Sequence, residues 1–367
     1  MHLGVAAAVV EGTLVRGDVE IVDGVVTRVG LRGGGSGFAI PGLVDLQVNG
    51  YAGVDVLRAE PGELVAMGAA LAHDGVLAYQ PTLVTSSPDR LRDALATVGQ
   101  ATGLGDGARI IGAHLEGPFL SPVRAGAHPP AQLRQPNLDL LASFLVAGCD
   151  VTTVTLAPEL DGADELIDEL VRRGTLVSLG HTDATAVQAR AGFDLGARAV
   201  THLFNAMRPF AHRDPGCVGA ALSRDDVTVM LIADGVHVAP EALLTAWRAA
   251  RGRIVLVSDA IAAAGLGDGS FSLGDVPVTV EDGVSRLADG VLAGAVRPLA
   301  WGLRYLVELG VPIVEAVDSV TRAPAALVGR PELSLLRPGD PADLVILGDD
   351  FAVERVLRGG TEVTGVS

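Results

Sequence analysis

The chain has no lysine, so all 27 basic residues among its 367 are arginines. Schiff-base chemistry on a lysine amine is therefore excluded, and so is a metal pair bridged by a carbamylated lysine. Cysteine is almost as scarce: Cys149 and Cys217 are too few for a disulfide scaffold and fit a reducing cytoplasm. We therefore expect a cytoplasmic protein whose chemistry depends on carboxylates, imidazoles and arginines.

An excess of positive charge is also missing. The net charge of −17 argues against general nucleic-acid binding, which requires a basic face. It does not exclude an anionic small molecule, because a local basic pocket can exist on an acidic surface. Although 49% of the residues are hydrophobic and the mean hydropathy is +0.41, no uninterrupted apolar run reaches the ~18 residues that a membrane span needs. The first residues also lack the basic region of a signal peptide. We expect neither a nucleic-acid partner nor a membrane partner.

The middle of the chain alternates short apolar β-type runs with helical patterns. Eight such strand–helix units predict an α/β fold, a (β/α)₈ TIM-like barrel closed by right-handed crossovers. The predicted strands are residues 43–48, 78–80, 110–114, 151–156, 176–179, 199–201, 228–232 and 254–258. The segment 262–294, rich in Gly and Asp and with a strand-like stretch at 276–280, is predicted to be an elaborated loop over the mouth of the barrel.

Both ends of the chain are β-rich. Short strands are predicted at 5–10, 13–16, 18–22 and 25–29, and the Asp23-Gly24 pair is a hairpin signal. The glycine tract 33–37 has no phosphate-loop pattern and is predicted to be a plain loop. The tail is β-like at 342–348 and 353–358. We expect a small β-sandwich domain formed by residues 1–40 and 331–367, and a catalytic barrel domain formed by residues 41–330.

Six polar residues lie at or just beyond the C-terminal ends of the apolar runs. A parallel barrel gathers these ends around one mouth, so residues far apart in sequence can face one cavity. A carboxylate and two imidazoles bind a divalent metal well and leave a coordination position for water. An additional carboxylate beside them can act as a base. The six residues are Gln47, Glu116, His181, His202, His237 and Asp259; of these, Glu116, His181 and His202 are the candidate ligands and Asp259 the candidate base.

Each of these residues also has an ordinary structural interpretation. A histidine at a strand end is commonly a plain polar residue. Glu116 could cap a helix or pair with an arginine, and Asp259 could be a helix N-cap. Spacing alone therefore leaves the metal site open.

A series of motifs narrows this choice. In order and over nearly the whole chain, they resemble the amidohydrolase superfamily, and within it the family of N-acetylglucosamine-6-phosphate deacetylases. The motifs are PGLVDLQVNG (41–50), HLEGPFL (114–120), GAH (126–128), GHT (180–182), THLFNAM (201–207), RDPG (213–216), IADGVH (232–237), SDA (258–260), LAG (292–294) and GDPADLV (339–345). Any one of them alone is weak, whereas the combination is specific.

The resemblance implies a reaction and a metal centre. The reaction would be hydrolysis of N-acetylglucosamine 6-phosphate to glucosamine 6-phosphate and acetate. One divalent metal, Zn²⁺ first, with Fe, Co, Mn or Cd as alternatives, would be held by Glu116, His181 and His202. Asp259 would act as general base and then as general acid, while His128 would orient the substrate or steady the oxyanion.

The resemblance also assigns the substrate side of the site. Gln47 and Asn49 would contact the substrate; they replace the His-x-His pair that holds a second metal in many superfamily members. His237, the backbone at Asn205 and Ala206, and Arg213 would bind the 6-phosphate. Arg213 would reach across from a neighbouring subunit, which implies a homodimer.

Two departures from the family pattern affect the acyl end and the lid of the site. Ala295 stands where the family often has serine and is followed by Arg297-Pro298, and Arg124-Ala125 replaces a more basic pair. Two other functions stay open at this point. One is hydrolysis of a cyclic amide, imide or base, and the other is non-catalytic sensing of a sugar phosphate on a retained barrel.

Overall fold

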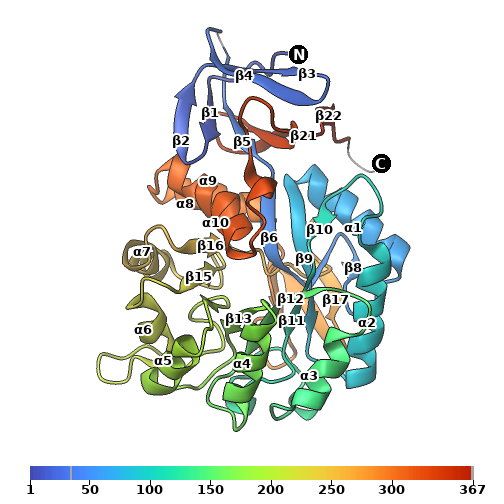
Figure 1. Ribbon diagram of the computed structural model, residues 1–367, viewed down its shortest axis with the longest axis vertical. Helices are drawn as coiled ribbons and strands as arrows, with labels where there is room; N and C mark the ends of the chain where they lie inside the picture. The colour runs from blue at the N-terminus through green and yellow to red at the C-terminus, as the bar shows by residue number, and fades with distance from the viewer. Residues whose placement is uncertain (34, 365–367) are drawn as a thin grey trace.

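The computed structural model describes residues 1–33 and 35–364; Gly34 of the predicted glycine loop and residues 365–367 lie outside it. A sheet formed by strands from both ends of the chain lies at one end of the molecule, next to a larger α/β barrel (Figure 1). The helices α8–α10 lie between the terminal sheet and the rest of the barrel in this view (Figure 1).

Eight parallel strands form the barrel, which confirms the predicted (β/α)₈ architecture. In spatial order they are β6 (Leu43–Val48), β9 (Val76–Val84), β11 (Ala113–Glu116), β12 (Val151–Leu156), β13 (Leu176–Leu179), β14 (Ala199–Val200), β15 (Thr228–Leu231) and β16 (Ile254–Leu256). Apolar side chains on both faces of these strands are buried, as expected for a sheet covered by helices outside and filled by side chains inside.

Helices connect successive strands and cover the outside of the barrel. Several begin with a side-chain cap: Ser87 accepts a hydrogen bond from the backbone N–H of Arg90 at the start of α2, and Thr185 forms a capping box with Gln188 at the start of α5. The helices are α1 (Pro61–His73), α2 (Pro88–Ala101), α3 (Leu138–Leu145), α4 (Ala163–Arg172), α5 (Ala186–Asp194), α6 (Gly216–Leu222), α7 (Pro240–Ala249), α8 (Leu299–Glu308), α9 (Ile313–Val320) and α10 (Arg322–Leu327). None of the helices within the described residues has the length and apolarity to cross a bilayer.

The barrel closes between its first and last strands just beyond β16. Val48 forms a parallel bridge with Ala260, and the backbone N–H of Asp259 donates to the carbonyl of Gln47 at 3.0 Å. The backbone N–H of Asn49 donates to the carbonyl of Ala260 at 2.8 Å. The closing seam therefore places the candidate base directly beside Gln47 and Asn49.

Two predicted barrel strands were wrong in extent. The predicted strand 110–114 is two strands, β10 (Arg109–Ile110) and β11, separated at Gly112, whose φ is +100°. A Cβ at this glycine would lie 2.4 Å from the side chain of Thr152, so both conformation and space require glycine here. The predicted strand 78–80 is only the middle of β9.

The terminal strands form a mixed six-stranded sheet in the order β2-β1-β5-β20-β21-β22. Their bounds are β1 (Ala7–Val10), β2 (Thr13–Arg16), β5 (Phe38–Pro41), β20 (Leu344–Leu347), β21 (Val353–Arg358) and β22 (Thr361–Glu362). The hairpin β3 (Asp18–Val22) and β4 (Val25–Leu31) turns at Asp23-Gly24 as predicted and shares one apolar core with the larger sheet. The two layers form the predicted small β-sandwich.

The segment after the last barrel strand is more regular than predicted. The strand-like stretch predicted at 276–280 lies in β18 (Val276–Glu281). Two strands that were not predicted, β17 (Gly269–Leu273) and β19 (Val284–Arg286), pair with it in a three-stranded antiparallel sheet. A short β7 (Gly50–Tyr51) and β8 (Val54–Asp55) ribbon lies between β6 and α1 in the sequence. The remaining short elements are the 3₁₀ turns η1 (Pro122–Arg124), η2 (Pro130–Gln132) and η3 (Pro331–Ser334).

Candidate active site

The structure gathers most of the predicted site residues around one cavity of about 300 Å³ at the C-terminal ends of the barrel strands. The lining includes the predicted ligands and base together with residues expected on the substrate side. The predicted residues in the lining are Asn49, Glu116, His128, His181, His202, Asn205, Ala206, His237 and Asp259. Gln47 lies one layer deeper, fully buried.

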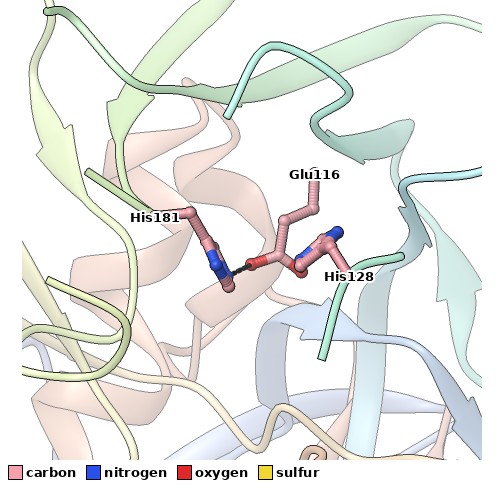
Figure 2. Close-up of side chains that lie close together, drawn as sticks. All are labelled: Glu116, His128 and His181. Carbon is pink, nitrogen blue, oxygen red and sulfur yellow. Dashed lines mark ion pairs between the residues drawn. The ribbon is translucent and has the colours of Figure 1, made fainter. Parts of the chain in front are cut away.

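Three donor atoms converge on one point in this cavity. The Nε2 atoms of His181 and His202 lie 3.1 Å apart, and the Oε1 atom of Glu116 is 3.3 Å from the first and 3.1 Å from the second. All three side chains are buried. Figure 2 shows Glu116 lying between His181 and His128, with its carboxylate facing both rings.

This convergence fits a divalent metal. Three lone pairs that face one another at such distances repel unless a proton or a cation lies among them. Ligands about 2.1 Å from a tetrahedral Zn²⁺ lie roughly 3.4 Å apart, close to the separations found here. The donor chemistry, two imidazoles and a carboxylate, is also that of catalytic zinc sites. Glu116, His181 and His202 could therefore hold one ion.

Hydrogen bonds on the far side of the rings distinguish the histidines. The Nδ1 atom of His181 lies 3.0 Å from the carbonyl oxygen of Arg124, so Nδ1 carries the proton and Nε2 keeps its lone pair. The Nδ1 atom of His128 instead accepts the backbone N–H of Thr85 at 3.1 Å, so the proton of this ring is on Nε2. Although His128 also falls within a ligand-like group with Glu116 and His181, its inward nitrogen is a donor.

Burial and neighbouring charges shift the pKa values of these side chains. Burial, together with the nearby His181, lowers the pKa of His128 to about 3, so the ring is neutral at pH 7. Burial opposes ionisation of Glu116, but the neighbouring imidazoles of His181 and His202 hold its pKa well below the ordinary value. The carboxylate is further held by Gln47, whose Nε2 donates to Oε1 at 3.0 Å. Glu116 is thus oriented and ionised, as a metal ligand would need to be.

Asp259 lies at the same cavity, held by an amide. The Nδ2 of Asn49 donates to its Oδ1 at 2.7 Å, a contact that differs from the substrate role expected for Asn49. Burial, then the charge of Glu116, raises the pKa of Asp259 to about 6, which is suitable for a base that must also return a proton.

The backbone at the site is strained where the strands end. His181, His202 and Asp259 have φ values of +46°, +31° and +53°. A non-glycine residue in this left-handed region costs on the order of 1–3 kcal/mol. In each case the residue follows a barrel strand and lines the cavity, so the strain is concentrated where the side chains are needed.

The expected phosphate-binding residues divide into two groups. His237, Asn205 and Ala206 line the cavity, and the Nδ1 of His237 lies 2.8 Å from Oδ2 of Asp234, so the other ring nitrogen is free to face a ligand. Arg213 lies in an exposed loop and does not line the cavity of its own chain. The structure therefore does not bring Arg213 to this site within one subunit.

Several cavity residues were not predicted from the sequence. Val84, Leu273, Val291 and Leu292 form an apolar part of the lining, and three of them come from or near the β17–β19 sheet. Only the expectation of a segment over the mouth pointed to them. Ala295 is buried, and Arg297 stacks on Trp301 with 3.8 Å between the guanidinium carbon and the ring centroid, so neither lines the cavity.

Comparison with known proteins agrees with this architecture. The profile of the amidohydrolase family matches residues 38–363. The chain belongs to the amidohydrolase family. This amidohydrolase is 36% identical over 355 residues to the N-acetylgalactosamine-6-phosphate deacetylase of Escherichia coli O157:H7, covering 94% of each chain. It is 39% identical to the N-acetylglucosamine-6-phosphate deacetylase of Rattus norvegicus, covering 87% of this chain and 82% of the relative.

A solved structure gives the same fold over the full length. It is a mutant N-acetyl-D-glucosamine-6-phosphate deacetylase from Mycobacterium smegmatis in complex with N-acetyl-D-glucosamine 6-phosphate. The TM-score is 0.93 at 35% identity, and the match covers 99% of both chains. The amidohydrolase described here therefore shares its complete architecture with a protein whose sugar-phosphate complex has been solved.

Proposed function

We propose that this amidohydrolase removes the acetyl group from N-acetylglucosamine 6-phosphate, giving glucosamine 6-phosphate and acetate. The observation that carries the proposal is the Glu116–His181–His202 cluster, which shares one cavity with Asp259. Relatives named N-acetylglucosamine-6-phosphate deacetylase, 35–40% identical to this chain, support the choice of substrate.

A single divalent metal, most simply Zn²⁺, would be held by Glu116, His181 and His202. Bound there, the metal supplies Lewis acidity to the scissile carbonyl and to a water molecule. Gln47 and Asn49, which offer amides in place of imidazoles, donate to Glu116 and Asp259 respectively. Their engagement with these carboxylates supports one ion rather than two.

The chain's own residues account for the proton movements. Asp259 accepts a proton from the attacking water as the C–O bond forms. It then passes this proton to the leaving nitrogen, so that the C–N bond breaks and the amine and acetate separate. The Nε2–H of His128 is available to donate to the developing oxyanion, a role that its neutral state and its Thr85 contact both favour. Asn49 keeps the Asp259 carboxylate in one orientation during both transfers.

The phosphate end of the substrate would lie near His237, Asn205 and Ala206. A dianion needs several donors, and each charge-assisted hydrogen bond contributes roughly 1.5–3 kcal/mol. Since Arg213 is exposed and outside the cavity of its own chain, it would have to come from the partner subunit of a homodimer.

A second candidate differs only in the sugar. The relative from Escherichia coli O157:H7 covers 94% of both chains and is named for N-acetylgalactosamine 6-phosphate. The two sugars are epimers at C4, a position remote from the acetamide. The same catalytic groups would serve both, so the choice rests on contacts of the sugar ring.

We also propose that the protein acts in the cytoplasm, consistent with its two free cysteines. The proposed domain division is residues 1–40 with 331–367 for the β-sandwich and 41–330 for the barrel. The position of β5, which leads from the sheet directly into β6, supports the first boundary.

The test is metal analysis of the purified protein together with two activity assays. The first is acetate release from the 6-phosphates of N-acetylglucosamine and N-acetylgalactosamine and from unphosphorylated N-acetylglucosamine, and the second is ring opening of a cyclic imide. Roughly one metal per chain and fastest turnover of N-acetylglucosamine 6-phosphate are expected. Faster turnover of the galactosamine compound selects the second candidate. Imide hydrolysis alone, or sugar-phosphate binding without turnover, contradicts the proposal.

Arg213→Ala tests the phosphate assignment. We expect it to raise KM for the phosphorylated sugar on the order of 10-fold or more while leaving the poor reaction of the plain sugar unchanged. Arg248→Ala, at another exposed arginine, is the matched control. Equal effects on both sugars would refute the role of Arg213. Sedimentation analysis of the parent tests the homodimer.

A further inference from the structure

The lid turn around η1 contacts a proposed metal ligand through its backbone. The carbonyl oxygen of Arg124, the last residue of η1, lies 3.0 Å from Nδ1 of His181. This contact places the proton of His181 on Nδ1 and leaves the Nε2 lone pair toward Glu116 Oε1, 3.3 Å away. The position of one lid carbonyl therefore sets the direction of one ligand.

The side chain of the same lid residue is tied down by Asp183. Both Nε and Nη2 of Arg124 lie 2.8 Å from Oδ1 of Asp183. The other carboxylate oxygen, Oδ2, accepts from Nη2 of Arg208 at 3.0 Å. With an arginine on each oxygen, the carboxylate has little freedom to rotate, and Arg124 is fixed at both its backbone and its side chain.

Asp183 is itself held in place by hydrogen bonds to Glu159. Its backbone N–H donates to Oε1 of Glu159 at 2.6 Å, and the hydroxyl of the fully buried Thr182 donates to Oε2 of the same carboxylate at 2.6 Å. The two residues that follow His181 are thus anchored to the segment after β12. An arginine bound to Asp183 is consequently bound to a segment that is anchored to the barrel.

The lid also packs directly on the ring of His181. Gly126 has a φ of +58°, and a Cβ placed there would lie 3.1 Å from Cε1 of His181. Backbone and ring are therefore in close contact, and a shift of the lid would move or tilt the imidazole.

We propose that Asp183 is a positioning residue for the metal centre: by binding Arg124 it fixes the lid carbonyl that orients His181 toward Glu116. This inference rests on the metal site of the proposed function. Asp183 does not line the cavity and does not contact the donor atoms of the proposed ligands. It acts only through Arg124. The contact of Arg208 with Asp214, at 2.6 Å, connects the same carboxylate to the loop that carries Arg213.

The decisive measurement is metal affinity, obtained on metal-free protein by Zn²⁺ competition with a chromophoric chelator, with the visible spectrum of the Co²⁺ form as a second readout. We expect Asp183→Ala and Arg124→Ala each to weaken Zn²⁺ binding about 10- to 100-fold, as loss of an outer partner of a histidine ligand does. The Zn²⁺ affinity of the double variant should equal that of the more impaired single variant, because both substitutions remove the same contact. Asp183→Glu should restore part of the affinity.

Two control variants separate positioning from general stability. Arg208→Ala removes the second arginine from the same carboxylate and should leave Zn²⁺ affinity within about threefold of the parent. Asp226→Asn removes a surface carboxylate that also contacts two arginines, Arg224 and Arg198, outside the cavity lining, and should have no effect. A structural role alone would lower the thermal midpoint of the metal-free protein without changing Zn²⁺ affinity or the Co²⁺ spectrum.

Failure of the Asp183 inference can be told apart from failure of the proposed function. If the parent binds Zn²⁺ and turns over substrate but Asp183→Ala and Arg124→Ala bind Zn²⁺ within twofold of it, only this inference is overturned. If the parent takes up neither Zn²⁺ nor Co²⁺, the metal centre of the proposed function fails, and the inference fails with it. Should Asp183→Ala not fold, Arg124→Ala decides alone, because it leaves the contact between Asp183 and Arg208 intact.

Discussion

The barrel mouth and the terminal sandwich are built in opposite ways. The mouth buries imidazoles and carboxylates, and its His181, His202 and Asp259 have left-handed backbone conformations. Two of its buried amide oxygens, Gln47 Oε1 and Asn49 Oδ1, have no hydrogen-bond partner among the described residues. These features cost stability, and they coincide with the groups that the chemistry requires.

The terminal sandwich has left-handed residues too, but at its turns. Glu11 and Asp23, with φ of +46° and +50°, lie at solvent-exposed hairpin tips, where the turn requires such a conformation. Apolar residues form the core between the layers, with Leu344 and Ile346 among its buried members. The comparison indicates that strain at the mouth serves function, whereas the sandwich contributes stability. Substitutions should therefore separate activity from stability by region.

The largest effect on activity is expected from Asp259→Asn. Loss of the base should lower kcat on the order of 10³-fold, with metal content unchanged. The measurement is acetate release beside elemental analysis. Asn49→Asp is not a suitable control, because it adds a charge beside the base; Asp226→Asn is suitable. A variant with near-parental kcat would remove Asp259 from the mechanism.

The same variant should behave differently in stability. Because the folded-state pKa of Asp259 is raised to about 6, the folded protein loses stability relative to the unfolded chain as pH rises from about 4 to 6. Metal-free Asp259→Asn should therefore be more stable than the metal-free parent above pH 6, by about 3 kcal/mol, and nearly equal to it near pH 4. Denaturant titration at the two pH values checks this sign.

Leu344→Ala should affect only stability. Leu344 is fully buried in β20, so its truncation should lower the free energy of unfolding by about 2–5 kcal/mol. The folded fraction should keep its parental kcat. Leu14→Ala in β2, where the side chain is 38% exposed, is the matched control and should change stability by less than about 1 kcal/mol. A lower kcat in folded Leu344→Ala would break the separation of the two regions.

The pH dependence of kcat should show an acid limb set by the base. Asp259 must be ionised to accept a proton, so kcat should fall about tenfold per unit below the limb's midpoint. A bound cation favours the ionised form, and the midpoint should thus lie at or below about 6. Measuring kcat rather than kcat/KM avoids titration of the free substrate phosphate, whose second pKa is also near ~6. A midpoint above about 7 would assign the limb to another group.

Asn49→Ala should produce the smallest of these changes. Removing the 2.7 Å contact to Asp259 should lower kcat roughly 10-fold with little change in KM, since the amide holds the base and not the sugar. A change confined to KM would instead return Asn49 to the substrate-binding role expected from the sequence.

Local patterns were sufficient to predict the barrel and its mouth. Alternating apolar runs and helical segments reflect local periodicity, and a polar residue after a parallel strand must face the common mouth. Glu116, His181, His202 and Asp259 were therefore candidates for one cluster, but the resemblance to the amidohydrolase superfamily was needed to choose a metal site over ordinary structural roles. The strand predicted at 110–114 was wrong because Gly112 interrupts it, and no neighbouring residue indicates the close approach of Thr152.

Long-range side-chain contacts could not be predicted in the same way. The Asn49–Asp259 hydrogen bond joins residues 210 positions apart, and that of Arg124 with Asp183 joins residues 59 apart. Neither contact leaves a local pattern, since each depends on the rotamer of both partners. For the same reason the tautomers of His128 and His181 emerged only from their distant backbone partners.

The pairing of β5 with both β1 and β20 has a consequence for biosynthesis. β5 ends at Pro41, and its second neighbour begins at Leu344, about 300 residues later. At roughly 5–20 residues per second, the ribosome needs on the order of 15–60 s to supply that neighbour. Throughout this interval one side of β5 offers unpaired backbone groups, the kind of edge that recruits other chains. Expression at a lower temperature, or with abundant chaperone, should therefore improve the yield of intact protein more than substitutions at the mouth of the barrel do.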